Sequence, residues 1–208
     1  NDAIGLIQTA EGAMTETHSM LQRMKTLTTQ AANGTYTKTA RTNIQAEIDA
    51  LNKEITRIAT TTEFNGEKPL NPAKAGNALT FFIGATADKT NAMTVGQLQM
   101  TATALTVDKI KVETTTLAFQ AMKSVDAAID RVSTYRATLG AAQNRLEHTV
   151  NNLKVTSENI TSAESRIRDT DMADEITAYT KNNILLQAAQ SMLSQSNAMP
   201  QGVLSMLQ

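Results

Sequence analysis

Apolar and small side chains recur along the first part of the chain with alternating spacings of three and four residues. This is the a/d pattern of a helix that buries one seam, and its members are Ile7, Ala10, Met14, Thr17, Leu21, Met24, Thr28 and Ala31. Met20 and Leu27 widen the stripe. We predict a helix from about Asp2 to Asn33, ended at Gly34 because glycine readily takes the left-handed conformation of a helix C-terminus.

A second apolar edge predicts a helix from about Thr37 to Thr60. Its members are Ile44, Ile48, Leu51, Ile55 and Ile58. Only a short connection separates the two helices, so we expect them to lie antiparallel.

Turn signals replace the helical period between residues 63 and 113. Phe64-Asn65-Gly66 is followed by two prolines, and the stretch from Leu79 to Gly84 is typical of a strand. A second strand is expected between Met93 and Met100. Few large apolar side chains occur here, so we expect a small β-containing region that buries little core alone.

The longest periodic segment predicts a third helix from Thr115 to Arg166, roughly 75–80 Å long at 1.5 Å per residue. The 4-3 spacing is held by Ala121, Val125, Ala128, Val132, Tyr135, Leu139, Ala142, Leu146, Thr149, Leu153, Thr156, Ile160, Ala163 and Ile167. A sustained heptad seam is typical of bundles, coiled coils and filaments. The first two helices are its expected partners.

Asp171 is expected to cap a last helix, whose apolar face has no counterpart left in the chain. The apolar members are Ile176, Ile184, Leu185, Ala188, Ala189, Met192, Leu193, Met199, Val203, Leu204, Met206 and Leu207. No charged residue follows Lys181. An uncharged, apolar helical tail indicates a contact with another molecule.

These elements predict a mainly α fold. It is an elongated antiparallel helical bundle or coiled-coil rod with a small β-hairpin-containing region and a C-terminal amphipathic helix. We divide the chain into N-terminal rod helices (1–62), a small β region (63–113), a long C-terminal rod helix (114–168) and a terminal segment (169–208).

Composition removes several function classes. The chain has 208 residues, 19 basic and 20 acidic side chains, a net charge of -1 and no cysteine. The charge balance does not favour nucleic acid or an anionic membrane surface, and the lack of cysteine excludes disulfides and thiolate metal sites. Aromatic residues are only 3% of the chain, which disfavours a ligand pocket. The amides within Asn182–Gln208 argue against a membrane span, and the N-terminus lacks the features of a signal peptide.

No catalytic, cofactor or metal site is expected. His18 and His148 lack metal-ligand spacing and are expected to be solvated helix residues. The acidic residues between Asp169 and Glu175 fail the calcium-loop pattern, because alanine and aspartate occupy its fifth and sixth positions. A helix cap and turn is the preferred interpretation.

Several long blocks together resemble bacterial flagellin over essentially the whole chain. They are Leu21–Met24, Gln30–Gly34, Ile44–Ile48, Glu63–Gly66, Leu139–Leu146, Ser165–Glu175 and Gln201–Leu207. The resemblance implies a structural subunit of the flagellar filament, secreted through the flagellar type III channel and polymerised beneath a cap. The family carries a further helix and spoke segment before the equivalent of Asn1, so we expect weak or no polymerisation of this chain alone.

The resemblance also implies two partners besides other copies of the subunit. The terminal helix is expected to line the filament's inner tube and to bind the flagellin export chaperone before assembly, through Ile184, Leu185, Ala188, Met192, Leu193, Val203, Leu204 and Leu207. A receptor surface for Toll-like receptor 5 is expected at Gln22, Arg23, Leu27 and Glu47. Lys25-Thr26 replaces the more usual Arg-Glu there, so one charge is lost.

Alternative interpretations stay open at this point. The Gln22-Arg23 surface is equally expected to make contacts between rods in a filament, and the two roles are compatible. A monomeric binding module is a second function class, and an enzyme is the third and least favoured. A flagellar hook-junction protein shares the terminal-helix architecture, but the Ser165–Glu175 and Gln22-Arg23 blocks favour flagellin.

Overall fold

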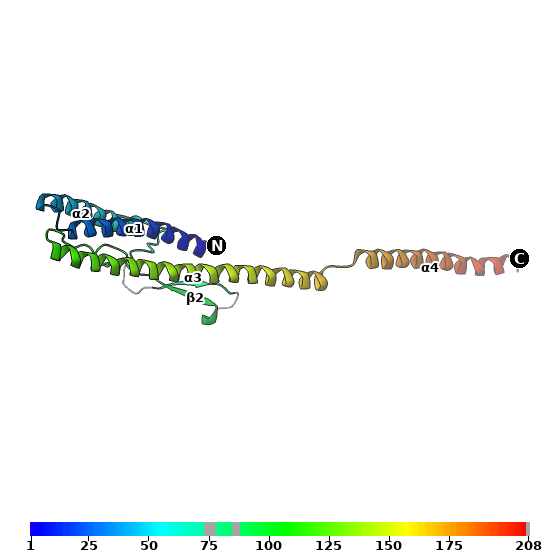
Figure 1. The fold of residues 1–208 in the computed structure, drawn as a ribbon. Coiled ribbons are helices and arrows are strands. Elements are labelled where there is room, and N and C mark those ends of the chain that lie inside the picture. Colours follow the sequence, from blue (N-terminus) through cyan, green and yellow to red (C-terminus); the bar gives the residue numbers. More distant parts are fainter. Residues whose placement is uncertain (73–77, 85–87, 207–208) are drawn as a thin grey trace. The chain divides into compact units, whose positions relative to one another are not determined.

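The computed structural model describes residues 1–72, 78–84 and 88–206. Its elements are α1 (Asp2–Ala32), α2 (Lys38–Thr61), β1 (Ala78–Phe82), the 3-10 helix η1 (Lys89–Asn91), β2 (Ala92–Gly96), α3 (Thr115–Arg168) and α4 (Met172–Met206). The chain forms two compact units, residues 1–152 and 153–208, and α3 contributes to both. The predicted mainly α fold with a small antiparallel hairpin is confirmed (Figure 1).

The first unit is built on α1 and α2, which run side by side along α3 (Figure 1). Thr37 caps α2 as its hydroxyl accepts a hydrogen bond from the Ala40 N–H at 3.3 Å. The predicted stop at Gly34 is wrong in its mechanism, because Gly34 does not take a positive φ. Instead, α1 ends because Asn33 adopts an extended backbone conformation. The Arg41 side chain donates hydrogen bonds to the carbonyls of Ala31 and Asn33 at 2.9 and 3.1 Å.

The predicted apolar stripes meet in one core. All eight a/d positions of α1 are buried, and Leu27 is buried beside them. Ile44, Ile48 and Ile55 supply the α2 side. On α3 the buried positions are Ala118, Ala121, Val125, Ala128, Val132, Tyr135, Leu139, Ala142 and Leu146. The methionines of the α1 stripe fill this core, as gap-filling side chains do in helical seams.

The β region adds to this core through its contacts with the helices. Leu70, Met93, Val95, Met100, Ala102, Leu105, Val107, Ile110 and Val112 are buried in the same cluster. β1 and β2 pair antiparallel with Ala78 opposite Gly96. Before them, Phe64 and Glu67 bracket a tight turn whose two central residues, Asn65 and Gly66, have φ of 52° and 84°. This is the left-handed pair that an Asn-Gly turn favours.

The seam of α3 changes character after Leu146. The helix ends at Arg168, two residues beyond the predicted end at Arg166, and Leu153, Ile160 and Ile167 are 43%, 62% and 89% exposed. The same heptad pattern therefore occurs in a buried and in an exposed environment. Its first half closes the core of the first unit, and its second half presents apolar side chains at the surface.

Candidate interaction surfaces

The exposed polar side chains of α1 and α2 meet across the helix pair. Arg23 donates from Nε and Nη2 to the same Glu47 oxygen, Oε1, at 2.8 Å each, and both side chains are about half exposed. Gln22 directly precedes Arg23, and its amide nitrogen lies 2.9 Å from Nε2 of His18, one turn earlier in α1. Three of the four expected receptor residues, Gln22, Arg23 and Glu47, thus lie on one surface, as their sequence positions suggested.

Leu27 does not belong to this surface. It is only 2% exposed and packs in the core, because it falls within the apolar stripe of α1. Its side chain is therefore not exposed to a partner. His18 is likewise half-buried with Nδ1 enclosed, which corrects the expectation of a solvated ring, whereas His148 is exposed as expected.

Two ion pairs that the sequence analysis did not identify join α1 to α3. Lys25 Nζ lies 2.8 Å from an Asp126 carboxylate oxygen, so this lysine is engaged within the subunit. Arg136 contacts Glu11 Oε1 at 2.7 Å with both groups about one-third exposed. Nothing local marks these pairs in the sequence, because their partners are far apart along the chain.

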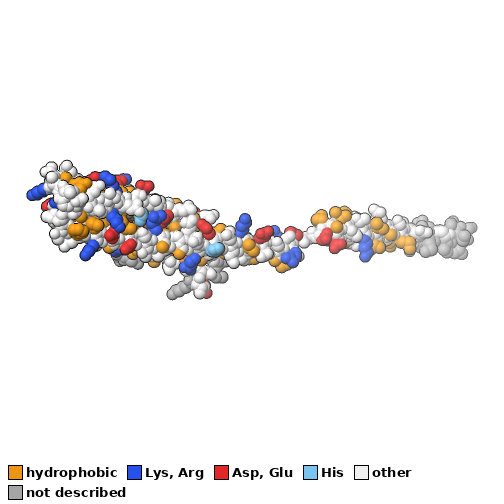
Figure 2. Space-filling model, viewed as in Figure 1, with side chains coloured by type: hydrophobic (Ala, Val, Ile, Leu, Met, Phe, Trp, Pro, Cys, Tyr) orange, Lys and Arg blue, Asp and Glu red, His pale blue; other side chains and the backbone are white. Residues whose placement is uncertain are grey.

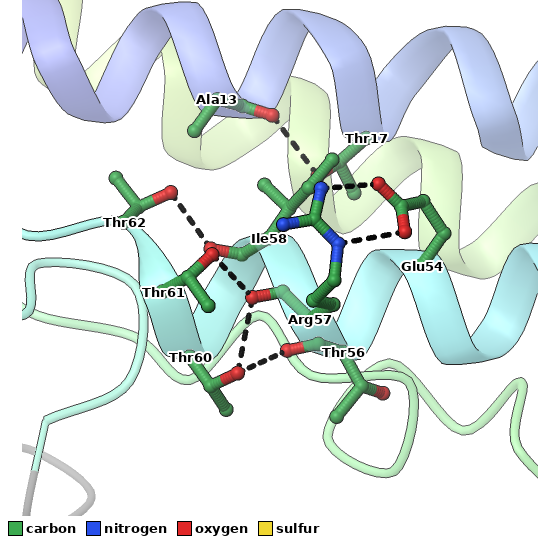
Figure 3. A network of polar contacts seen from close by, with 9 residues as sticks. All are labelled: Ala13, Thr17, Glu54, Thr56, Arg57, Ile58, Thr60, Thr61 and Thr62. Carbon is green, nitrogen blue, oxygen red and sulfur yellow. Dashed lines mark hydrogen bonds and ion pairs between the residues drawn. The ribbon is translucent and has the colours of Figure 1, made fainter.

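The C-terminal turns of α2 carry a local polar network (Figure 3). Arg57 binds both carboxylate oxygens of Glu54, at 2.8 and 2.5 Å. This hydrogen bond lowers the pKa of Glu54 and raises the pKa of Arg57. Threonine hydroxyls at 60, 61 and 62 donate back to carbonyls one turn earlier. These groups are mutually satisfied, so the network is typical of a solvated helix surface.

Tyr135 is the buried aromatic side chain of α3. It is 3% exposed, while Tyr36 and Tyr179 are 36% and 68% exposed. Burial raises the pKa of its phenol, and a backbone hydrogen bond at Leu98 acts in the opposite direction. The tyrosine therefore joins the return from the β region to α3.

The second unit presents apolar side chains at its surface along its described length (Figure 2). On α4, Ile184, Leu185, Met192 and Leu193 are 61%, 56%, 70% and 64% exposed, and Ala188 is exposed with them. The side chains of Val203 and Leu204, and the whole of Leu207, lie outside the described residues. Soluble proteins rarely leave such a series uncovered, so this helix is the strongest candidate for a binding surface.

The junction between α3 and α4 is stabilised by short-range contacts. Asp171 accepts a hydrogen bond from the Ala173 N–H at 2.9 Å, which is the predicted helix cap. Ser165 donates to Asp169 at 2.5 Å, and Arg168 pairs with Glu164 at 2.9 Å.

Across the described part of the chain, no group of acidic or histidine side chains has the geometry of a metal site. None of the described helices is long and apolar enough to cross a bilayer.

Comparison with known proteins matches both ends of the chain to one family. The bacterial flagellin N-terminal helical region matches residues 1–75, and the bacterial flagellin C-terminal helical region matches residues 122–207. Flagellin of Bacillus subtilis (strain 168) is 48% identical over 239 aligned residues, covering 99% of this chain and 78% of that protein. Flagellin FlaB2 of Treponema pallidum (strain Nichols) is 41% identical and covers 99% and 76%.

Solved structures agree with these matches. The crystal structure of Bacillus cereus flagellin superposes with a TM-score of 0.64 at 30% identity, covering 78% of this chain and 92% of that one. FliC from Burkholderia pseudomallei gives 0.58 at 20% identity, covering 69% and 99%, and supports the fold alone. The family resemblance drawn from the sequence blocks is thereby confirmed.

Proposed function

The chain belongs to the bacterial flagellin family and is a structural subunit of the flagellar filament, not an enzyme, and we propose that it is exported through the flagellar type III channel and added beneath the filament cap. The observation that carries the proposal is the uncovered apolar surface of the second unit, including α4 and the second half of the α3 seam. A helical polymer supplies the missing partner, because each copy can cover its neighbour in a head-to-tail contact that does not close.

Expression of this protein as the sole flagellin of a motile bacterium tests the assignment. Since this chain alone is expected to polymerise weakly, we expect a small yield of filaments from the natural sequence and none from Leu193→Asp. Leu193 is 64% exposed in the subunit, and a carboxylate there would be desolvated in the polymer. Asn183→Asp is the matched control, since it adds the same charge to α4 at an exposed position that is already polar. Normal filaments from Leu193→Asp would contradict the proposed inner contact.

The same helix is proposed to bind the export chaperone before assembly. Leu185, Met192 and Leu193 would lie in an apolar groove of the chaperone, as amphipathic helices do in groove-type recognition. We expect Leu185→Asp to weaken chaperone binding at least tenfold in calorimetric titration, and Asn183→Asp to change it less than threefold. Equal affinities for the two variants would remove α4 from the chaperone interface.

The polar surface of Gln22, Arg23 and Glu47 is proposed to bind Toll-like receptor 5 when the subunit is free. It is supported by the exposed Arg23–Glu47 pair, since arginine with polar neighbours often anchors interfaces. We expect Arg23→Ala to lower receptor signalling at least tenfold. Arg57→Ala is the control, because Arg57 is an equally exposed, ion-paired arginine outside this surface. Equal signalling by both variants would contradict the receptor role.

A further inference from the structure

The segment that returns from the hairpin to α3 buries its backbone without joining a sheet. Residues 102–112 form turns and irregular structure, yet Ala102, Leu105, Val107, Ile110 and Val112 are buried. Buried backbone N–H and C=O groups require partners, because an unpaired one costs about 1–3 kcal/mol. Neither a strand nor a helix of this segment supplies them.

Turn hydrogen bonds pair some of these groups, such as the Val107 N–H with the Ala102 carbonyl at 2.9 Å, and side chains of α2 pair four others. Gln45 donates from its amide nitrogen to the Ile110 carbonyl at 3.1 Å and accepts from the Val112 N–H at 2.9 Å. Asn52 donates to the Val107 carbonyl at 2.8 Å. Thr56 accepts from the Ala102 N–H at 3.3 Å through its hydroxyl.

The three side chains share one stripe of α2. They are separated by seven and by four residues, which are about two turns and one turn of a helix. Gln45 and Asn52 are each 7% exposed, so both amides are in the interior, where hydrogen bonds contribute most. The Gln45 amide binds one carbonyl and one N–H, as a neighbouring β-strand would.

We propose that Gln45, Asn52 and Thr56 form a backbone clamp that fixes the axial position of residues 102–112 on α2. Apolar packing alone defines this position loosely, because small and branched side chains can exchange places along a helix groove. The clamp removes that freedom at three separate points. Gln45, Asn52 and Thr56 are therefore positioning residues. They bind the backbone of residues 102–112, so their effect does not depend on the apolar side chains of that segment.

The clamp also determines where the β1–β2 hairpin leaves the helices. Met100 N–H donates to the Leu70 carbonyl at 2.9 Å, which closes the base of the excursion directly before the clamped segment. A shift of residues 102–112 would therefore move the hairpin base. A consequence for assembly rests on the proposed filament function. In a filament, the clamp would fix the position along the helices at which the hairpin is presented to neighbouring subunits.

Gln45 and Asn52 are not equivalent members of the clamp. Both hydrogens of the Gln45 amide nitrogen are engaged, because it also donates to Asp49 at 2.8 Å. Asn52 leaves its Oδ1 buried without a partner among the described groups. Loss of Gln45 leaves two backbone groups unpaired, whereas Asn52→Leu leaves one and removes an unpaired atom. We expect Gln45→Met to be the more damaging change.

Hydrogen exchange of individual amides in the full chain tests the clamp. Relative to Met14 N–H in the α1 core, Val112 N–H is expected to exchange at least tenfold faster in Gln45→Met. In Thr60→Val, which leaves Gln45 and its contacts unchanged, it is expected to stay within threefold of the natural protein. Val112 protection unchanged in Gln45→Met would overturn the proposal.

Thr56 and Thr60 provide a matched pair. Both hydroxyls donate to a carbonyl one turn earlier in α2, but only Thr56 also accepts from Ala102. Thr56→Val is expected to speed Ala102 N–H exchange at least fivefold, and Thr60→Val less than twofold. Equal effects would refute the clamp even if Gln45→Met unfolds the chain.

The assembly consequence has its own readout. Filament yield is expected to fall at least threefold in Gln45→Met and to stay unchanged in Thr60→Val. Should the natural protein enter no filament even beside a full-length flagellin, the proposed function fails, while the exchange data still test the clamp. Full yield from Gln45→Met, with Val112 exchange accelerated, would show that the clamp does not govern assembly.

Discussion

Leu139 and Leu153 occupy the same heptad position of α3, two heptads apart, but differ in burial. Leu139 is 2% exposed and Leu153 is 43% exposed. Leucine-to-alanine substitution removes about three methylene equivalents, roughly 2.4 kcal/mol at 0.8 kcal/mol each. A residual cavity raises the cost for a fully buried site to about 2–5 kcal/mol. We therefore expect Leu139→Ala to lower the free energy of unfolding by that amount.

The expected cost of Leu153→Ala is below about 1 kcal/mol in the free subunit. Nearly half of its surface is already in water, no closed cavity forms, and alanine is a slightly better helix former. In the filament, where neighbours cover this seam, the same change should weaken assembly. The two substitutions thus separate the part of the seam that folds the subunit from the part proposed to join subunits.

Urea unfolding followed by near-ultraviolet circular dichroism measures the difference. Tyr135 is the one tyrosine of the chain that is buried, so the signal reports on the core that contains Leu139. The midpoint should fall clearly for Leu139→Ala and hardly for Leu153→Ala, with the denaturant slope unchanged. Equal destabilisation by both substitutions would refute the division of the seam at Leu146.

Three further predictions concern single sites. Thr106 has a φ of 61°, which costs a β-branched residue about 1 kcal/mol or more. Thr106→Asn should therefore raise the free energy of unfolding by about 0.5–1 kcal/mol, as measured by thermal unfolding. Thr103→Asn is the control and should leave that free energy unchanged. Burial raises the Tyr135 pKa above its unfolded value near 10, so its contribution to stability is present below that pH and lost as pH rises through the folded pKa; Tyr135→Phe should remove this alkaline loss in urea titrations. Glu11→Gln leaves the one-third-exposed Arg136 without its anion and should cost about 1 kcal/mol in the same assay, more at low than at high salt.

The helical framework was predictable because its signals are local. The 3-4 spacing of apolar residues located α1, α2 and α3 within a few residues, and Asp171 marked the start of α4. Asn65-Gly66 marked a turn, because few residue pairs adopt two positive φ values at low cost. In each case the residue that determines the structure lies inside the element or at its end.

The remaining features depend on partners distant in the sequence. Gln45 and Asn52 bind backbone groups 65 and 55 residues away, and a backbone partner leaves no signature in a sequence. The heptad period also does not reveal whether a seam is covered by the same chain, so the exposure of Ile160 could not be predicted. The position of Leu27 in the sequence was compatible with the apolar stripe of α1 and with the receptor surface. In the structure its side chain is buried in the core.

Hydrogen exchange of residues 153–197, compared between the free subunit and the assembled filament, tests the central claim most directly. This claim is that the apolar side chains of these residues, exposed in the subunit, are covered by neighbouring copies. The account predicts weak protection of these amides in the free subunit and protection at least a hundredfold stronger in the filament. Equal protection in the two states would contradict it.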